Sequence, residues 1–109
     1  MRQNKFRNNP TEWDGIKFDS KKECSRYIVL KMMEDNGEIT DLRRQVRYLL
    51  IPTQKICGKT ERSIYYVADF VYCKNGTFVV EDVKGFRTQV YKIKRRLMKQ
   101  IHGIEVVEV

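Results

Sequence analysis

The most constraining feature of this sequence is a pair of β-forming runs joined by a tight turn. Residues 63–73 are almost entirely β-branched and aromatic, and residues 77–84 form a second run of the same kind. Asn75-Gly76 between them is a dipeptide that favours the left-handed backbone of a two-residue hairpin turn. These two runs are therefore predicted to be paired, antiparallel strands at the centre of a sheet.

Two helices are predicted, one on each side of these strands in the chain. Ser20 followed by Glu23 matches a capping box, and apolar residues then recur at helical spacing until Asn36-Gly37 ends the pattern. A second helix is expected between its cap, Thr88, and Gly103. The apolar stripe predicted for this second helix consists of Val90, Ile93, Leu97 and Ile101.

Residues 39–51 and residues 104–109 are predicted to be the first and last strands of the sheet, and a short N-terminal hairpin turns at Asp14-Gly15. Residues 54–62 are interpreted as a loop. Because a helical crossover normally joins parallel strands, the prediction is an α/β (α+β) fold. It has a mixed four-stranded sheet flanked by two helices in the order α-β-β-β-α-β. Residues 1–9 are predicted to be a flexible basic arm before one domain over residues 10–109.

The charge of the chain indicates its partner. A net charge of +8 on 109 residues favours a polyanion, with nucleic acid before an anionic membrane, because no apolar stretch approaches the length of a spanning helix. Three widely spaced cysteines with a single histidine argue against zinc and are interpreted as reduced thiols without disulfides. We therefore expect a cytoplasmic, DNA-binding protein.

Asp69 is the residue that propensity explains least, since a carboxylate inside an apolar strand is costly to desolvate. The period of two places Asp82 and Lys84 on one face of the neighbouring strand, where they can converge with Asp69. Magnesium binds to one or two carboxylates while keeping waters, and a nearby ammonium can stabilise developing charge. These parts suffice for phosphodiester hydrolysis. The alternative is a buried ion pair with no catalytic role.

Asp69 followed by Asp82-Val83-Lys84 resembles the motif of the PD-(D/E)XK nuclease superfamily, whose fold also runs helix, three strands, helix, strand. Ala68 stands where the motif name has proline. More narrowly, the stretch from Asp14-Gly15 to Gly85 is similar to a family of small phage and prophage proteins without an assigned role. The resemblance implies a restriction-endonuclease-like fold.

The resemblance also implies roles for individual residues. Asp69, Asp82 and the backbone carbonyl of Val83 would bind Mg²⁺, with Mn²⁺ as a substitute, and Lys84 would serve the attacking water. Glu23 matches a first-helix glutamate that often joins this site, although its place in the capping box explains it equally well. Glu81 beside Asp82 leaves open which of the two carboxylates faces the metal. The implied activity is that of an endodeoxyribonuclease in phage recombination or branched-DNA processing in a bacterial host.

Basic side chains indicate the surface that would hold DNA. The second helix has no acidic residue between Gly85 and Gly103, and its cations fall at helical spacing opposite the apolar stripe. The predicted DNA-binding residues are Arg44, Gln45, Arg87, Lys92, Arg95, Arg96 and Lys99. A non-catalytic DNA-binding or packaging accessory module is the alternative function. Homodimerisation is left open, because the sequence has no clear interface stripe.

Overall fold

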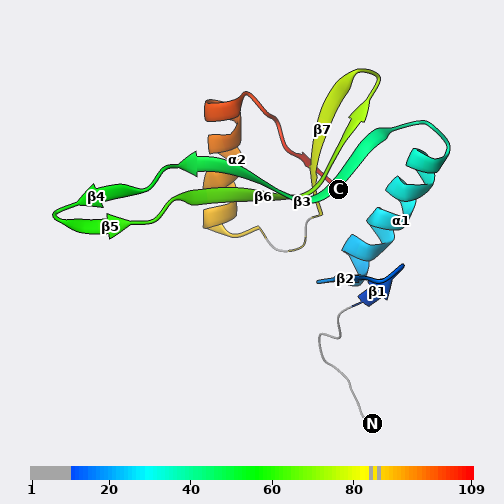
Figure 1. Cartoon of the computed structure of the whole chain (residues 1–109), viewed down its shortest axis with the longest axis horizontal. Helices are drawn as coiled ribbons and strands as arrows, with labels where there is room; N and C mark the ends of the chain where they lie inside the picture. The colour runs from blue at the N-terminus through cyan, green and yellow to red at the C-terminus, as the bar shows by residue number, and fades with distance from the viewer. Residues whose placement is uncertain (1–10, 84, 86) are drawn as a thin grey trace, which may run out of the picture.

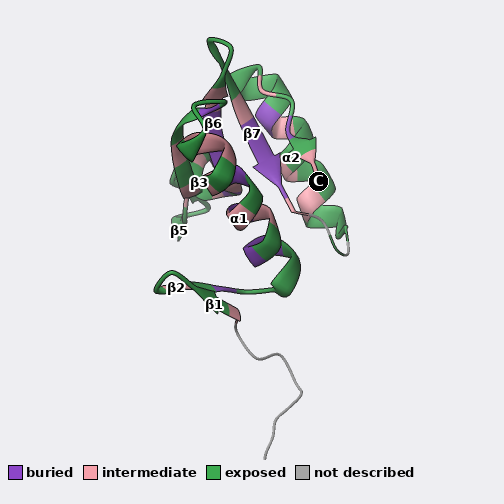
Figure 2. Cartoon of the chain, turned by 90° about the vertical axis from the view of Figure 1, so that its right-hand side faces the viewer, coloured by how far each residue is buried: buried purple, intermediate pink, exposed green. Residues whose placement is uncertain are grey.

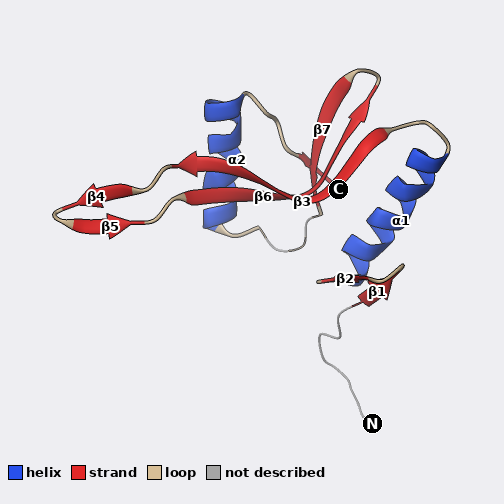
Figure 3. Ribbon diagram, in the orientation of Figure 1, coloured by secondary structure: helices blue, strands red, loops and turns tan. Residues whose placement is uncertain are grey.

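The computed structural model describes residues 11–83, 85 and 87–109, so the predicted basic arm and Lys84 lie outside the described residues. The elements are, in order, β1 (Thr11–Trp13), β2 (Ile16–Phe18), α1 (Lys21–Asp35), β3 (Thr40–Ile51), β4 (Gln54–Ile56), β5 (Lys59–Glu61), β6 (Ile64–Lys74), β7 (Thr77–Asp82), α2 (Gln89–His102) and β8 (Val107–Glu108) (Figure 1, Figure 3). The predicted mixed α+β fold with a four-stranded sheet and two helices is confirmed.

The main sheet has the strand order β3-β6-β7-β8. β3, β6 and β7 are antiparallel to one another, whereas β8 returns parallel to β7 after the α2 crossover, as predicted. The Asn75-Gly76 turn joins β6 to β7, and both residues have the positive φ angles that this turn needs. The mixed character of the sheet thus follows from one hairpin turn and one helical crossover.

Both helices begin and end where their capping residues predicted. The Ser20 hydroxyl accepts a hydrogen bond from the Glu23 backbone N–H at 3.1 Å, and Thr88 does the same for Tyr91 at 3.0 Å. At the far end of α2, Gly103 has a left-handed backbone with φ of 69°, which ends the helix. No helix in the described ranges is long and apolar enough to cross a membrane.

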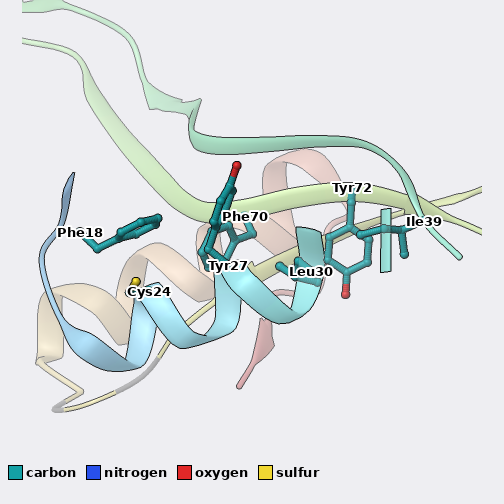
Figure 4. Close-up of a cluster of buried hydrophobic side chains, with 7 residues drawn as sticks. All are labelled: Phe18, Cys24, Tyr27, Leu30, Ile39, Phe70 and Tyr72. Atoms are coloured by element: carbon teal, nitrogen blue, oxygen red, sulfur yellow. The ribbon is translucent and has the colours of Figure 1, made fainter. Parts of the chain in front are cut away.

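Two hydrophobic clusters form on different parts of the sheet, one under each helix. The α1 cluster consists of Phe18, Cys24, Tyr27, Leu30, Ile39, Phe70 and Tyr72 (Figure 4). The α2 cluster consists of Leu50, Tyr66, Ala68, Val71, Val80, Met98 and Val106. Trp13 of the N-terminal hairpin adds an edge-to-face contact with Tyr27, with ring centroids 6.1 Å apart. The chain therefore buries its core in two groups.

β3 and β6 exchange faces between these clusters. In β3, Leu42 packs on the α1 cluster and Val46 on the α2 cluster, although four residues along a regular strand would return to the same face by way of Arg44. Arg44 pairs with Phe70 of the α1 cluster, and Val46 pairs with Ala68 of the α2 cluster. Gln45 between them has a φ angle of 52°, outside the β region. This irregular residue marks the change of face.

The predicted apolar stripe of α2 is wrong for three of its four residues. Val90, Ile93 and Ile101 are exposed, and Leu97 alone is half-buried. The helix instead turns Met98 fully into the core, with half-buried Tyr91 and Lys94 on the same side; Figure 2 shows much of α2 exposed. The periodicity predicted the helix correctly but not which of its sides is buried. Apolar residues occupy more of its circumference than the sheet covers.

The interpretation of residues 54–62 as a loop is also wrong. β4 and β5 pair as an antiparallel hairpin, and the turn residues Cys57 and Gly58 both have positive φ angles. Every residue of both strands is exposed. The segment has no hydrophobic period because neither face is buried, which is why its sequence did not predict strands.

Candidate functional site

The side chains of Asp69 and Asp82 meet where β6 and β7 part. Phe70 pairs with Glu81, so the next step of this register sets Asp69 opposite Asp82, and the two carboxyl groups are within hydrogen-bonding reach. Oδ2 of Asp69 also accepts a hydrogen bond of 2.8 Å from the backbone N–H of Val83. The predicted convergence of Asp69 and Asp82 is therefore present, and Lys84 lies outside the part of the chain that the structure describes.

Tyr66 is a third member of the site that the sequence did not reveal. Its hydroxyl donates a 2.7 Å hydrogen bond to Oδ2 of Asp82, and its ring lies in the α2 cluster. Burial and the adjacent carboxylate both raise the pKa of this hydroxyl, so it stays a donor at neutral pH. Tyr66 thus orients the Asp82 carboxylate from the side of the α2 cluster.

Glu23 reaches the site from α1 through Gln45. The Gln45 amide donates to Oε2 of Glu23 at 3.2 Å and to Oδ1 of Asp69 at 3.3 Å, and so bridges the two acids. Arg44 lies 3.6 Å from the Glu23 carboxylate and 4.5 Å above the Phe18 ring. Of the predicted capping box, the Ser20 half is formed, since its hydroxyl caps the helix. The Glu23 carboxylate points to its partners on β3.

Glu81 lies on the opposite face of β7 and has its own partners. Arg26 of α1 binds both carboxylate oxygens, at 2.9 and 2.6 Å, and the Tyr72 hydroxyl donates to one of them. Only 1% of Glu81 is exposed, so it is paired inside the core rather than open to a ligand. Of the two neighbouring acids, Asp82 is therefore the one that shares a face with Asp69.

An open cleft of about 420 Å³ lies in front of these carboxylates. Its lining residues come from α1, β6, the end of β7 and the first two turns of α2. They are Glu23, Tyr66, Val67, Asp69, Asp82, Val83, Thr88, Val90, Tyr91 and Lys94. One signal for the helical part is present in the sequence, since Thr88, Tyr91 and Lys94 recur every three residues along one side of α2.

The carboxylates of the site repel one another, and this repulsion is what a divalent cation would relieve. Burial and the hydrogen bond with Asp82 raise the pKa of Asp69 to about 7. Burial, together with the charge of Asp19, also raises the pKa of Glu23. No three acidic, histidine or cysteine side chains among the described residues are gathered closely enough to enclose a metal. Two adjacent carboxylates with room for water and a phosphate nevertheless match the partial ligand set that Mg²⁺ prefers.

We expect the metal-free protein to lose stability as the pH rises from about 4 to about 7. The pKa of Asp69 is raised in the folded state, so protonation of this carboxyl group stabilises the fold. The full contribution is present below the ordinary pKa of 3.8. This contribution is lost as the pH passes the folded value of about 7. Urea denaturation in chelator across this range measures the change. Asp69→Asn should flatten the profile, and an identical slope in that variant would contradict the prediction.

The predicted DNA-binding cations on α2 and just before it have acidic neighbours that come from the end of the chain. Lys99 pairs with Glu105, while Arg87 and Arg95 lie 2.8 and 3.8 Å from Glu108. Glu108 also accepts a hydrogen bond from Tyr91, which ties α2 to β8. Lys92 and Arg96 are exposed on the same helix. The absence of acids within the helix sequence therefore does not make its surface uniformly basic.

The cations also differ in how close they lie to the cleft. Lys94 lines it, and Arg44 contacts Glu23 at its wall. Arg95, Arg96 and Lys99 instead line a separate hollow with Glu105 and Val106. Of the residues predicted to bind DNA, Arg44 and Gln45 are thus the ones that directly contact an acid of the candidate site.

The sequence matches the profile of the family described as "Protein of unknown function (DUF1064)" over residues 3–106. No curated protein matches the chain. Because the match extends over nearly the whole length, the chain belongs to the DUF1064 family.

Proposed function

We propose that this member of the DUF1064 family is a Mg²⁺-dependent endodeoxyribonuclease of the PD-(D/E)XK type with a restriction-endonuclease-like fold. The observation that carries the proposal is the contact between Asp69 and Asp82 at the head of an open cleft, with Glu23 linked to them through Gln45. Two partly buried acids held against each other cost stability, which a bound cation would recover. A purely structural ion pair would not place two acids together.

The residues of the site have separate tasks in this proposal. Asp69 and Asp82, with the Val83 carbonyl, would hold Mg²⁺, which supplies an activated water and neutralises charge on the phosphoryl group. Tyr66 and the Val83 N–H orient the two carboxylates through hydrogen bonds of 2.7 and 2.8 Å. Lys84, which the resemblance assigns to the attacking water, completes the proposed set.

Glu23 and Gln45 extend the site toward α1. The Gln45 amide donates to Glu23 and Asp69 together, so it keeps both carboxylates turned toward the cleft. Arg44 partly neutralises Glu23, which lowers the cost of placing a further acid at the wall of the same cleft. The substrate is proposed to be DNA because the chain carries a net charge of +8. Processing of branched DNA during phage recombination is the finer proposal.

We expect the wild-type protein to cleave DNA with Mg²⁺ or Mn²⁺ and to be inactive in chelator. The assay compares linear, nicked, single-stranded and four-way-junction DNA with each cation. Preferential cutting of the junction would support branched-DNA processing, whereas equal cutting of linear duplex would contradict that finer proposal. Absence of cleavage on every DNA form with every divalent cation would leave a DNA-binding or packaging module as the better assignment.

A further inference from the structure

The β4–β5 hairpin, for which the sequence predicts a loop, stands at the end of a projecting ribbon. On the N-terminal side of Asp69, β6 pairs with β3 alone among the described strands. These two strands continue past α2 to the β4–β5 hairpin (Figure 1). We call residues 46–68 the arm; this segment is distinct from the basic N-terminal residues 1–9. All residues from 52 to 62 are exposed, so the end of the arm is not stabilised by a core.

The face of the arm turned away from α2 leads directly to the cleft. Val46, Tyr48 and Tyr66 pack toward α2, so the alternation of the strands turns the pairs Arg47–Val67 and Leu49–Tyr65 to the other face. On that face the Arg47 guanidinium lies 3.9 Å over the Tyr65 ring. Val67 lines the cleft beside Asp69, together with Tyr66 and residues of α2, so this face meets the candidate site at the edge of β6.

Charge favours a polyanion on the arm over a second copy of the chain. The basic residues of the arm are Arg47, Lys55, Lys59 and Arg62, and Glu61 is its only acid. A second copy carries the same net charge of +8 and would be repelled, whereas a phosphate backbone would release counterions from this surface.

The structure of the arm favours a duplex over a single strand. Single-stranded DNA is usually held by aromatic rings on which bases stack, but Arg47 already covers one face of Tyr65. Lys55 pairs with Thr60 while Lys59 pairs with Ile56, one step along, so the two lysines extend from opposite faces of the hairpin. Cations on both faces fit a ribbon in the major groove, which is about 12 Å wide, between two phosphate backbones.

We propose that the arm binds duplex DNA to one side of the candidate site and follows it for roughly one helical turn. The turn residue Gly58 is eleven residues from Asp69, which is about 36 Å at roughly 3.3 Å per residue. One turn of B-DNA is about 34 Å long. The inference rests on the proposed function only in that the bound duplex is the DNA presented to the site, since binding by the arm needs no cleavage.

The test is the triple variant Lys55→Gln, Lys59→Gln and Arg62→Gln, with its affinity for a duplex of about thirty base pairs measured in chelator across a salt series. We expect binding at least about tenfold weaker at low salt, and a log–log salt slope smaller by about 2 to 3, because each phosphate contact contributes roughly 0.9. The thermal midpoint should not change, since all three side chains are exposed.

Two matched variants sharpen the result. Glu61→Gln removes the acid of the arm and should tighten duplex binding. Lys74→Gln removes one positive charge at the exposed end of β6, away from the arm, and should leave the salt slope unchanged. An unchanged slope in the triple variant overturns the proposal, as does a loss confined to single-stranded DNA. A changed sedimentation coefficient with unchanged DNA binding would also overturn it, in favour of a second copy.

The arm and the nuclease can fail separately. If wild type cuts no DNA but the triple variant loses duplex binding, the arm is supported and the proposed chemistry is not. If wild type cuts DNA and the triple variant binds and cuts the same duplex equally well, the chemistry is supported and the arm is overturned.

Discussion

Asp82→Asn is expected to lower the rate of Mg²⁺-dependent DNA cleavage by about a thousandfold or more, while duplex binding in chelator stays the same or tightens. Asn keeps the size of the side chain but removes the charge that would hold the cation, and loss of such a transition-state contact has a large effect on rate. Ground-state contacts with DNA lose nothing, because the substitution removes a negative charge that faces the phosphate. Cleavage and binding are measured on the same DNA.

Glu81→Gln is the matched control for this variant. Glu81 is the next residue in the chain but faces Arg26 and Tyr72 on the other side of the sheet. It should weaken the fold without a comparable loss of cleavage at a temperature where the protein remains folded. Equal cleavage by wild type and Asp82→Asn would exclude Asp82 from the reaction. A similar loss in Glu81→Gln would show that the assay reports stability instead of chemistry.

Arg26→Met is expected to lower the free energy of unfolding by about 2 to 3 kcal/mol, the largest stability effect that we predict for a single substitution. The guanidinium pairs with the Glu81 carboxylate, whose side chain is 2% exposed, and removing one partner of a buried pair leaves the other charge unpaired. This loss of stability is at or below the usual range for a broken buried pair, because 29% of the Arg26 side chain is accessible to water. Urea denaturation measures the change.

Lys31→Met on the same helix is the matched comparison. Lys31 pairs with Glu34 at the surface, and its loss should cost much less stability than the loss of Arg26, because solvent screens an exposed pair. Combining Arg26→Met with Glu81→Met should recover much of the stability, since replacing both buried charges by apolar side chains is often neutral. Equal stability losses in Arg26→Met and Lys31→Met would show that the Arg26–Glu81 pair is no stronger than a surface pair.

Local signals were sufficient to predict most of the secondary structure. Asn75-Gly76, the caps Ser20 and Thr88, and the terminating Gly103 each act through the conformation or hydrogen bonds of a few adjacent residues. The pairing of Asp69 with Asp82 followed from the hairpin that these signals define. The β4–β5 hairpin was missed because its positive-φ turn contains Cys57 and its residues have no buried face.

The rest of the site depends on contacts between residues far apart in the chain. Tyr66 reaches Asp82 from several residues away along the neighbouring strand, and Gln45, whose backbone departs from the β region, joins Glu23 to Asp69. Similarly, the Arg26–Glu81 pair depends on how α1 lies against β7. No periodicity in the sequence reports such distances, so these residues could be assigned only once the elements were placed.

The division of the core into two clusters has a consequence for how the molecule comes apart. Glu23 belongs to α1, whereas Tyr66 and its partner Asp82 lie against the α2 cluster, and Gln45 and Asp69 stand at the change of face between them. We expect these two regions to unfold less cooperatively without a cation, and a cation held between them would tie them together. We therefore expect Mg²⁺ to sharpen the thermal transition into one step, with Glu23 supplying the link from the α1 side.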